Sequence, residues 1–226
     1  MKKRVVFMGG KKPGEACLEI LRRHPDVELV GNVGNMNGGV WNFTGQIRQL
    51  KPDLIIVVYY DYILSPEIIA IPPMGCINLH LALAEEYRGC YPTTWAIING
   101  ETRTGVTLHY IDEGIDTGDI IAQTEVPIYP QDTGKDLYER CTRAGVALFE
   151  SELQSILDGT NDRRPQSSTR RTLSYRRIFP SHEVTDMYHH GKNYIRALYF
   201  PPWPKPYVDI GGRKFYLVEE GDMPDD

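Results

Sequence analysis

Residues 53–80 read DLIIVVYYDYILSPEIIAIPPMGCINLH, and they predict a strand, a helix and a second strand in that order. The run DLIIVVYY is apolar almost throughout, as expected for a strand that is covered on both faces. Ser65 and Pro66 are typical of the start of a helix, and Cys76 to His80 form the second strand. Because a helix joins the two strands, we expect them to lie parallel in one sheet with a right-handed crossover.

The same alternation extends in both directions from this segment. Upstream, RVVFMGG and VELVGNV predict strands, while GEACLEILRRH and WNFTGQIRQLK predict helices. Downstream, PTTWAIING predicts a helix, and GVTLHYI and IIAQTEVPI predict strands. The longest helix follows these strands and ends near Gly159. The sequence therefore predicts an α/β fold of the Rossmann-like kind with a mainly parallel sheet.

The composition changes beyond the longest helix. TNDRRPQSSTRR is polar, contains proline and has no apolar rhythm, which is typical of a linker. EVTDMYHHGKNYIRALYF then predicts a helix, and PPWPKPYVDIGGRKFYLVEE predicts a hairpin with Gly211 and Gly212 in its turn. We therefore expect a main domain over 1–160, a linker over 161–182 and an appendage of helix and hairpin over 183–226.

Charge and cysteine content exclude several classes of protein. The chain has 226 residues, is 41% hydrophobic and carries a net charge of −5, which argues against a surface built to bind nucleic acid. Its four cysteines contain no CxxC motif, so we expect reduced thiols and a cytoplasmic protein. The apolar run VVFM near the N-terminus is too short for a signal peptide, and no stretch is long enough to span a membrane.

Polar side chains gather where the strand CINLH ends. Asn78 and His80 are two residues apart, so they point to the same face of the sheet, beyond whose carboxyl edge ligands bind. The acidic segment DEGIDTGD can add a carboxylate, and amide, imidazole and carboxylate together suit transfer of a carbonyl-bearing group to a nucleophile. Taken alone, the Asn-x-His pair is better explained as a satisfied strand end, and the acidic segment as a tight turn or, less well, a calcium loop.

The segment INLHLALAEEYRGCYPTTWAIINGETRTGVTLHYIDEGIDTGDII resembles the core of the formyltransferases that use 10-formyltetrahydrofolate. The resemblance is strong over residues 53–128 and rests on Asn-x-His, YRG, TGVT and DxGxDTGD in combination. It implies that residues 1–160 form a catalytic formyltransferase domain. One departure follows the histidine: the family commonly has Ser-Leu-Leu-Pro, whereas this chain has LALAEE with Glu85 and Glu86.

The resemblance implies a mechanism without a metal. The acceptor's amine attacks the formyl carbon, and Asn78 stabilises the developing oxyanion. His80 takes or relays the amine proton, or helps hold the oxyanion, while Asp116 orients His80. The family also implies a folate pocket lined by Tyr62, Ile63, Leu64, Asp112, Asp116, Thr117, Gly118 and Asp119. Packing is the better explanation for at least one of the tyrosines 59, 60 and 62.

Two loops and the tail are candidates for binding the acceptor. Gly9, Lys11 and Lys12 lie in a turn that opens a helix, which favours anions, although a solvated turn explains them almost equally well. In YRG, Tyr87 and Arg88 are further candidates, with a loop-bracing hydrogen bond as the other role for the arginine. The tail resembles that of the sugar-nucleotide formyltransferases, which implies a base pocket or a dimer surface built from Tyr199, Phe200, Trp203 and Tyr207.

These features predict formyl transfer from 10-formyltetrahydrofolate to the amine of a nucleotide-linked amino-dideoxy sugar, with dTDP as the expected carrier, for surface polysaccharide synthesis. The chain is acidic and too short after residue 160 for the second barrel domain of the transfer-RNA enzyme. The apolar tail predicts a homodimer that uses the region from about residue 185 onward. Two alternatives stay open: a formyltransferase for another small amine, and a catalytically silent folate- or nucleotide-binding module.

Overall fold

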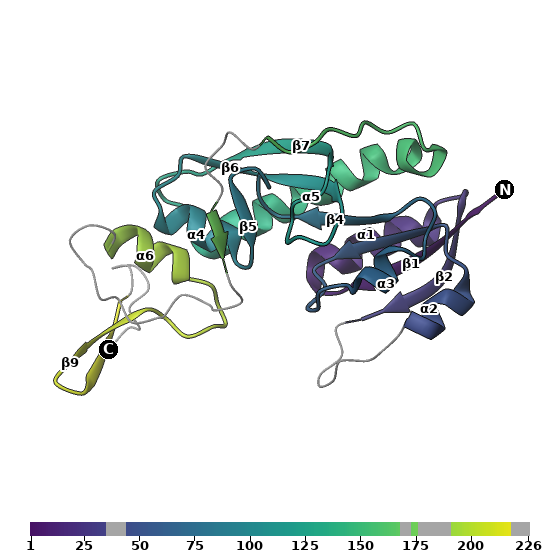
Figure 1. Cartoon of the computed structure of the whole chain (residues 1–226). Helices are drawn as coiled ribbons and strands as arrows, with labels where there is room; N and C mark the ends of the chain where they lie inside the picture. Colours follow the sequence, from purple (N-terminus) through teal and green to yellow (C-terminus); the bar gives the residue numbers. More distant parts are fainter. Residues whose placement is uncertain (35–43, 168–172, 176–190, 218–226) are drawn as a thin grey trace.

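A six-stranded sheet forms the centre of the computed structural model, which describes residues 1–34, 44–167, 173–175 and 191–217 (Figure 1). The strand order within these residues is β2–β1–β3–β4–β6–β7. The strands are β1 (Lys3–Gly9), β2 (Val27–Val33), β3 (Leu54–Val58), β4 (Cys76–His80), β6 (Arg103–Tyr110) and β7 (Ile120–Pro127). The first four run parallel, whereas β6 is antiparallel to both β4 and β7. The predicted Rossmann-like fold with a mainly parallel sheet is confirmed.

Helices cover both faces of the parallel half of the sheet, as Figure 1 shows. One face packs against α1 (Lys11–Arg23) and α5 (Gly134–Asp158), and the other against α2 (Thr44–Leu50) and α3 (Pro66–Ile69). Alternate residues of β3 enter the two cores, because Ile56 packs with the first pair of helices and Ile55 with the second. This two-sided burial explains why the run DLIIVVYY is apolar almost throughout.

Local signals set the ends of the longest helix. At the N-terminus of α5, the Thr133 hydroxyl accepts from the N–H of Asp136, and the Asp136 carboxylate accepts from the N–H of Thr133. This reciprocal capping box satisfies two backbone donors that the helix itself leaves unpaired. At the other end Gly159 adopts a φ of 69°, a left-handed conformation that favours glycine.

The sheet changes direction at β4. This strand pairs with β3 in parallel on one side and with β6 in antiparallel on the other, where Asn78 lies opposite His109 and His80 lies opposite Thr107. The pairing of β6 with β7 is irregular beside this point: Leu108 faces Ala122, but His109 faces Ile120. Ile121 is therefore the extra residue of a β-bulge next to the paired polar side chains.

A second group of elements flanks the sheet. The two-stranded pair β5 (Tyr87–Gly89) and β8 (Leu173–Tyr175) runs parallel, and α4 (Pro92–Ile98) packs against α6 (Gly191–Leu198). The hairpin β9 (Tyr207–Ile210) and β10 (Arg213–Tyr216) projects from this end of the molecule in yellow (Figure 1). Its turn contains Gly211 and Gly212 as predicted, and the φ angles of 61° and 81° explain both glycines.

The structure describes two parts of the predicted linker over 161–182, namely residues 161–167 and 173–175. Residues 161–167 pack back onto the main sheet, with an antiparallel bridge between Arg164 and Ile120, and β8 joins β5. The first part of the predicted helix, 183–190, lies outside the described residues. The domain boundaries themselves stay a prediction. In the described segments, no helix combines the length and the apolar character needed to cross a bilayer.

Candidate active site

The predicted trio meets at the carboxyl end of β4. The amide Nδ2 of Asn78 lies 3.2 Å from Asp116 Oδ1, and Nδ1 of His80 lies 3.5 Å from Asp116 Oδ2. Asn78 and His80 share one face of the strand, and Asp116 reaches them from the loop between β6 and β7. The structure thus brings together the three side chains that the family resemblance singled out.

A second imidazole completes the cluster. His109 is only 1% exposed, and its Nε2 lies 3.4 Å from Asp116 Oδ1 and 3.2 Å from Asn78 Nδ2. It reaches this position because it is directly opposite Asn78 in the antiparallel register. Sequence reasoning missed His109: the strand GVTLHYI contained it, but nothing in the sequence fixed the register that sets it opposite Asn78.

Both imidazoles are anchored to backbone carbonyls. Nε2 of His80 lies 2.9 Å from the carbonyl of Tyr87, and Nδ1 of His109 lies 2.7 Å from the carbonyl of Tyr110. A carbonyl only accepts, so each of these nitrogens donates. The remaining nitrogen of each ring faces Asp116 and donates to that carboxylate only when the ring is protonated. The two imidazoles, the Asn78 amide and the Asp116 carboxylate therefore form one connected polar cluster.

The environment of Asp116 favours its charged form. Burial by itself raises the pKa of the Asp116 carboxyl. The charge of His80, the hydrogen bond and charge of His109, and the N–H of Gly89 outweigh burial and hold that pKa well below its usual range. The Gly89 N–H donates to Oδ2 over 2.8 Å. An anion is therefore fixed between two imidazoles at the strand end.

The acidic loop is built around internal hydrogen bonds. Asp112 accepts from the Gly114 N–H over 3.0 Å and from the Thr117 hydroxyl over 2.5 Å, and Asp119 accepts from Arg163 over 2.8 Å. At Gly118 a Cβ atom would lie 1.9 Å from the Tyr110 carbonyl, so only glycine fits there. Four of the loop residues that were predicted to bind folate therefore shape the loop in this structure: Asp112, Thr117, Gly118 and Asp119.

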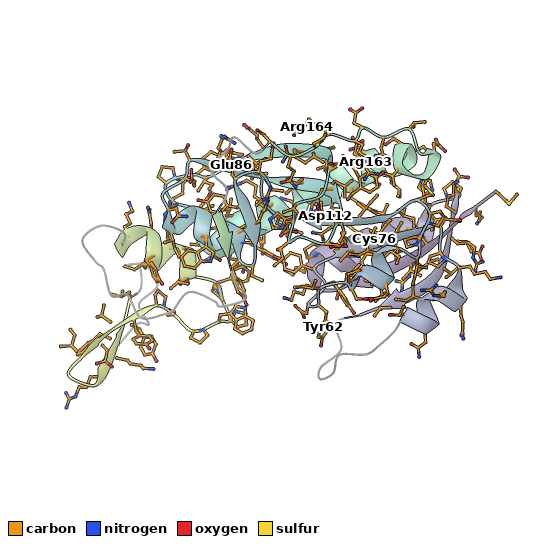
Figure 2. All side chains as sticks on the ribbon, viewed as in Figure 1. Tyr62, Cys76, Glu86, Asp112, Arg163 and Arg164 are labelled. Carbon is orange, nitrogen blue, oxygen red and sulfur yellow. The ribbon has the colours of Figure 1, made fainter. Side chains whose placement is uncertain are left out.

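A segment from the predicted linker covers the acidic loop. Figure 2 shows Arg163 and Arg164 where this segment runs beside β7. Arg164 contacts the buried Glu85 with both terminal nitrogens at 3.3 Å, and the Glu86 carboxylate accepts from Arg103 over 2.8 Å. The two glutamates that depart from the family pattern therefore lie in ion pairs within the protein.

Gln166 is the second residue that sequence reasoning missed. Its side chain contacts the acidic loop and Arg88 through three hydrogen bonds. The residue lay inside TNDRRPQSSTRR, whose polar composition predicted only a linker. No sequence pattern marked it, since a single glutamine in a polar run has no periodicity.

The other side of the predicted folate pocket follows β3. The Tyr62 ring packs edge-on against the Tyr60 ring at 5.4 Å, Leu64 is buried, and Ile63 is 81% exposed. Tyr59, directly after the strand, is partly buried, and this burial raises its pKa; it packs edge-on against Tyr138. As expected for at least one of these tyrosines, Tyr59 serves the packing of the core.

The glycine-rich turn lies at the end of β1. At Gly9 a Cβ atom would lie 1.9 Å from the Val58 carbonyl, so the residue is a glycine because two strands approach closely there. Lys11 lies 3.9 Å from Asp61 and above the Tyr59 ring, and Lys12 lies 4.0 Å from Glu139. Both lysines are more than half exposed, so their weak ion pairs leave them accessible to an anion.

Both side chains predicted to bind in YRG have hydrogen-bond partners within the protein. Tyr87 is buried, and its hydroxyl donates to Glu101 and accepts from Asn99, so its place in the acceptor site stays a prediction. Arg88 donates to the Ala84 carbonyl over 3.2 Å and to Gln166 over 2.6 Å. These are the loop-bracing bonds that were its alternative role.

The four aromatic residues of the tail divide into two pairs. The Phe200 ring packs against the Tyr138 ring of α5, with 5.4 Å between the ring centres, and the ammonium of Lys205 lies above the Tyr199 ring. Trp203 is 66% exposed, and Tyr207 packs against Tyr216 within the hairpin. Phe200 therefore joins the appendage to α5 of the main domain, whereas Trp203 stays largely exposed and Tyr207 packs within the hairpin.

Fold and cluster together define a class of protein: a Rossmann-like α/β domain with amide, imidazole and carboxylate groups at one strand end. A protein-family model described as formyl transferase matches the sequence over residues 37–153, just over half of the chain. The chain belongs to the formyl transferase family. Among the described residues, no group of three or more His, Cys, Asp or Glu side chains is arranged to hold a metal ion.

The chain is similar both to curated formyltransferase sequences and to solved formyltransferase structures. A methionyl-tRNA formyltransferase from Agathobacter rectalis is 38% identical over 178 residues, which cover 75% of this chain and 54% of the relative. The chain thus spans about half the length of the curated relatives it matches. Among solved structures, a 4-N formyltransferase from Francisella tularensis shares the fold, with a TM-score of 0.78, 22% identity and 96% coverage of both chains.

A third relative was solved with ligands. The N-formyltransferase from Helicobacter canadensis, in complex with folinic acid and dTDP-3-aminofucose, is 25% identical and has a TM-score of 0.71. The similarity covers 95% of this chain and 86% of that one. It extends through the appendage as well as the main sheet.

Proposed function

We propose that this chain transfers the formyl group of 10-formyltetrahydrofolate to the amine of a nucleotide-linked amino-dideoxy sugar. The observation that carries the transfer is the meeting of Asn78, His80 and Asp116 at one strand end in a member of the formyl transferase family. The sugar acceptor is supported by the similarity, along 95% of this chain, to an enzyme that was solved with a folate and a dTDP-sugar.

The transfer balances with the groups in the cluster. The neutral amine of the acceptor attacks the formyl carbon, and the carbonyl electrons move onto the formyl oxygen. Asn78 donates to this oxyanion, while the coupled His80–Asp116 pair receives the amine proton. When the oxyanion collapses, the bond from the formyl carbon to N10 of the folate breaks, and N10 takes up a proton. The products are the formamide and tetrahydrofolate.

The geometry adds one requirement to this mechanism. The Nδ2 group of Asn78 has two hydrogens and already faces two acceptors, Asp116 Oδ1 and His109 Nε2. It can donate to a formyl oxygen only after giving up one of them. Protonated His109 no longer accepts at Nε2 and itself donates to Asp116, which releases an Asn78 hydrogen for the oxyanion.

The predicted folate and acceptor sites lie on neighbouring loops. The folate site comprises Tyr62, Ile63 and Leu64 with the loop from Asp112 to Asp119, so that the formyl group reaches the cluster. Lys11 and Lys12 then bind the diphosphate, and the aromatic tail contacts the base. The exposed hairpin is covered by a second copy in a homodimer, because a hairpin with exposed apolar side chains is only marginally stable alone.

The methionyl-tRNA enzymes are the second candidate, because the curated relatives carry that name at up to 43% identity. Purified protein is incubated with 10-formyltetrahydrofolate and dTDP-, UDP- or GDP-linked amino sugars, with methionyl-tRNA in parallel. We expect mass spectrometry to detect the sugar formamide, and the matching nucleotide diphosphate to raise the melting temperature. Formylation of methionyl-tRNA alone would contradict the sugar acceptor, and no transfer to any amine would favour a silent binding module.

A further inference from the structure

One side chain outside the predicted site holds the backbone of the acidic loop. Nε2 of Gln166 donates to the carbonyl of Asp116 and to the carbonyl of Gly118, each over 2.8 Å. Its Oε1 accepts from Arg88 over 2.6 Å. Both hydrogens of the amide are therefore used on the two carbonyls that flank Thr117, and the oxygen is used on a third partner.

The conformation of Asp116 explains why such a contact matters. Its φ is 53°, in the left-handed region, where a side chain other than glycine is under strain. Such a conformation persists only where the surroundings fix it. On the side-chain end Asp116 is held by the N–H of Gly89 and by Asn78, and on the backbone end by Gln166.

Gln166 is itself fixed from both sides along the chain. Two residues earlier, Arg164 exchanges backbone hydrogen bonds of 2.7 and 2.9 Å with Ile120. One residue later, the N–H of Ser167 donates to Glu85 over 2.6 Å, and Glu85 is 4% exposed. The glutamine is thus presented to the loop by a segment that is anchored to β7 and to a buried carboxylate.

We propose that Gln166 is a positioning residue for Asp116: it holds the loop backbone so that the carboxylate stays between His80 and His109. It acts through Asp116, 2.8 Å from the carbonyl of that residue. Without the amide donors, the strained φ relaxes and the carboxylate leaves the imidazoles and the Gly89 N–H. The pKa of Asp116 then returns toward its ordinary value of about 4.

The primary test needs no acceptor. In Gln166→Met the size is retained and the amide is lost, and Gln166→Glu keeps the shape but replaces the donor with an oxygen. Gln154→Met makes the same change on the exposed face of α5, where the amide donates to Asp158. The ¹³C carboxyl resonances of Asp are followed by NMR against pH, and Asp116→Asn assigns the resonance.

We expect the Asp116 carboxylate to stay ionised down to the lowest pH at which the wild type and Gln154→Met stay folded. In both Gln166 variants it titrates in the ordinary Asp range instead. A lowered melting temperature with an unchanged Asp116 titration would overturn the proposal, because the contact would then only fasten the segment.

Turnover gives a second readout, which rests on the proposed function. For an acceptor that the transfer assay identifies, kcat should fall about tenfold or more in both Gln166 variants, while KM for 10-formyltetrahydrofolate changes less than about twofold. A rise in KM with unchanged kcat would overturn the positioning role. If no acceptor is found, the proposed function fails, and the carboxyl titration still decides the role of Gln166.

Discussion

The strand-end cluster and the C-terminal hairpin differ in how completely their groups are partnered. Around Asp116 the polar side chains are buried, with His80 7% and His109 1% exposed, and the carboxylate contacts three side chains and one backbone N–H. In the hairpin, Phe215 and Tyr216 are 50% and 58% exposed. The side chains of the cluster are therefore held by partners within the chain, whereas the hairpin presents apolar side chains to solvent.

The largest expected effect separates these two regions directly. Asn78→Ala and His80→Ala should each lower kcat about a hundredfold or more, because in the proposed mechanism each removes a group that acts at the developing charge. Circular dichroism should show that both variants fold. Asn32→Ala, on the exposed side of β2, is the matched control. Near-normal turnover in both site variants would contradict the proposed mechanism.

Asp116→Asn tests whether the carboxylate of the cluster supports turnover or binds the nucleotide. The amide cannot hold a protonated imidazole as a carboxylate does, so turnover should fall at least tenfold while nucleotide affinity stays nearly the same. Steady-state rates and nucleotide titration calorimetry are measured on the same preparations. A large loss of affinity with little loss of turnover would make Asp116 a binding residue instead.

The hairpin is tested without disturbing the cluster. Leu198 is fully buried, so a cut at residue 185 would remove part of the core; we place the cut after Pro202. The shortened chain should be monomeric by light scattering, and its acceptor affinity should fall more than its folate affinity. Phe215→Ser is the point variant for the same surface. An intact dimer with unchanged acceptor affinity would show that the hairpin only covers its own subunit.

The smallest effect concerns acid stability. The pKa of Asp116 is lower in the folded protein than its ordinary value of about 4. Its contribution to the free energy of unfolding is therefore complete above that ordinary value and is lost as pH falls toward the folded pKa. Urea unfolding should show wild type more stable than Asp116→Asn at pH 6, with the difference shrinking below about pH 4. A difference that grows in acid would contradict this sign.

The sequence predicted the parts of the fold and site that depend on local pattern. Continuous apolar runs marked β1 and β3, and the spacing of Asn78 and His80 indicated a shared face. The meeting with Asp116 came from the family resemblance, since the composition of an acidic loop does not say which carboxylate turns inward. For the parallel half of the sheet, pattern and burial agree because both faces are covered.

What could not be predicted depends on pairing between distant segments. His109 joins the cluster through the antiparallel register of β6 against β4, and Gln166 joins it because a polar segment folds back along β7. The partners of Tyr87 were equally hidden from the sequence, because its hydroxyl bonds to Glu101 and Asn99 through the packing of distant segments. Side-chain type alone does not distinguish a binding tyrosine from a packed one.

The bulge at Ile121 has a consequence for anyone who would transplant this chemistry to another scaffold. It changes the β6–β7 pairing at His109, so a design that copied the side chains onto a regular ladder would lose the local twist that accompanies them. Deleting Ile121 would remove the extra residue and leave Ile120 and Ala122 as neighbours in a regular ladder opposite His109 and Leu108. A design would therefore have to copy the irregular β6–β7 pair as well as the side chains, although none of the three catalytic candidates lies on β7.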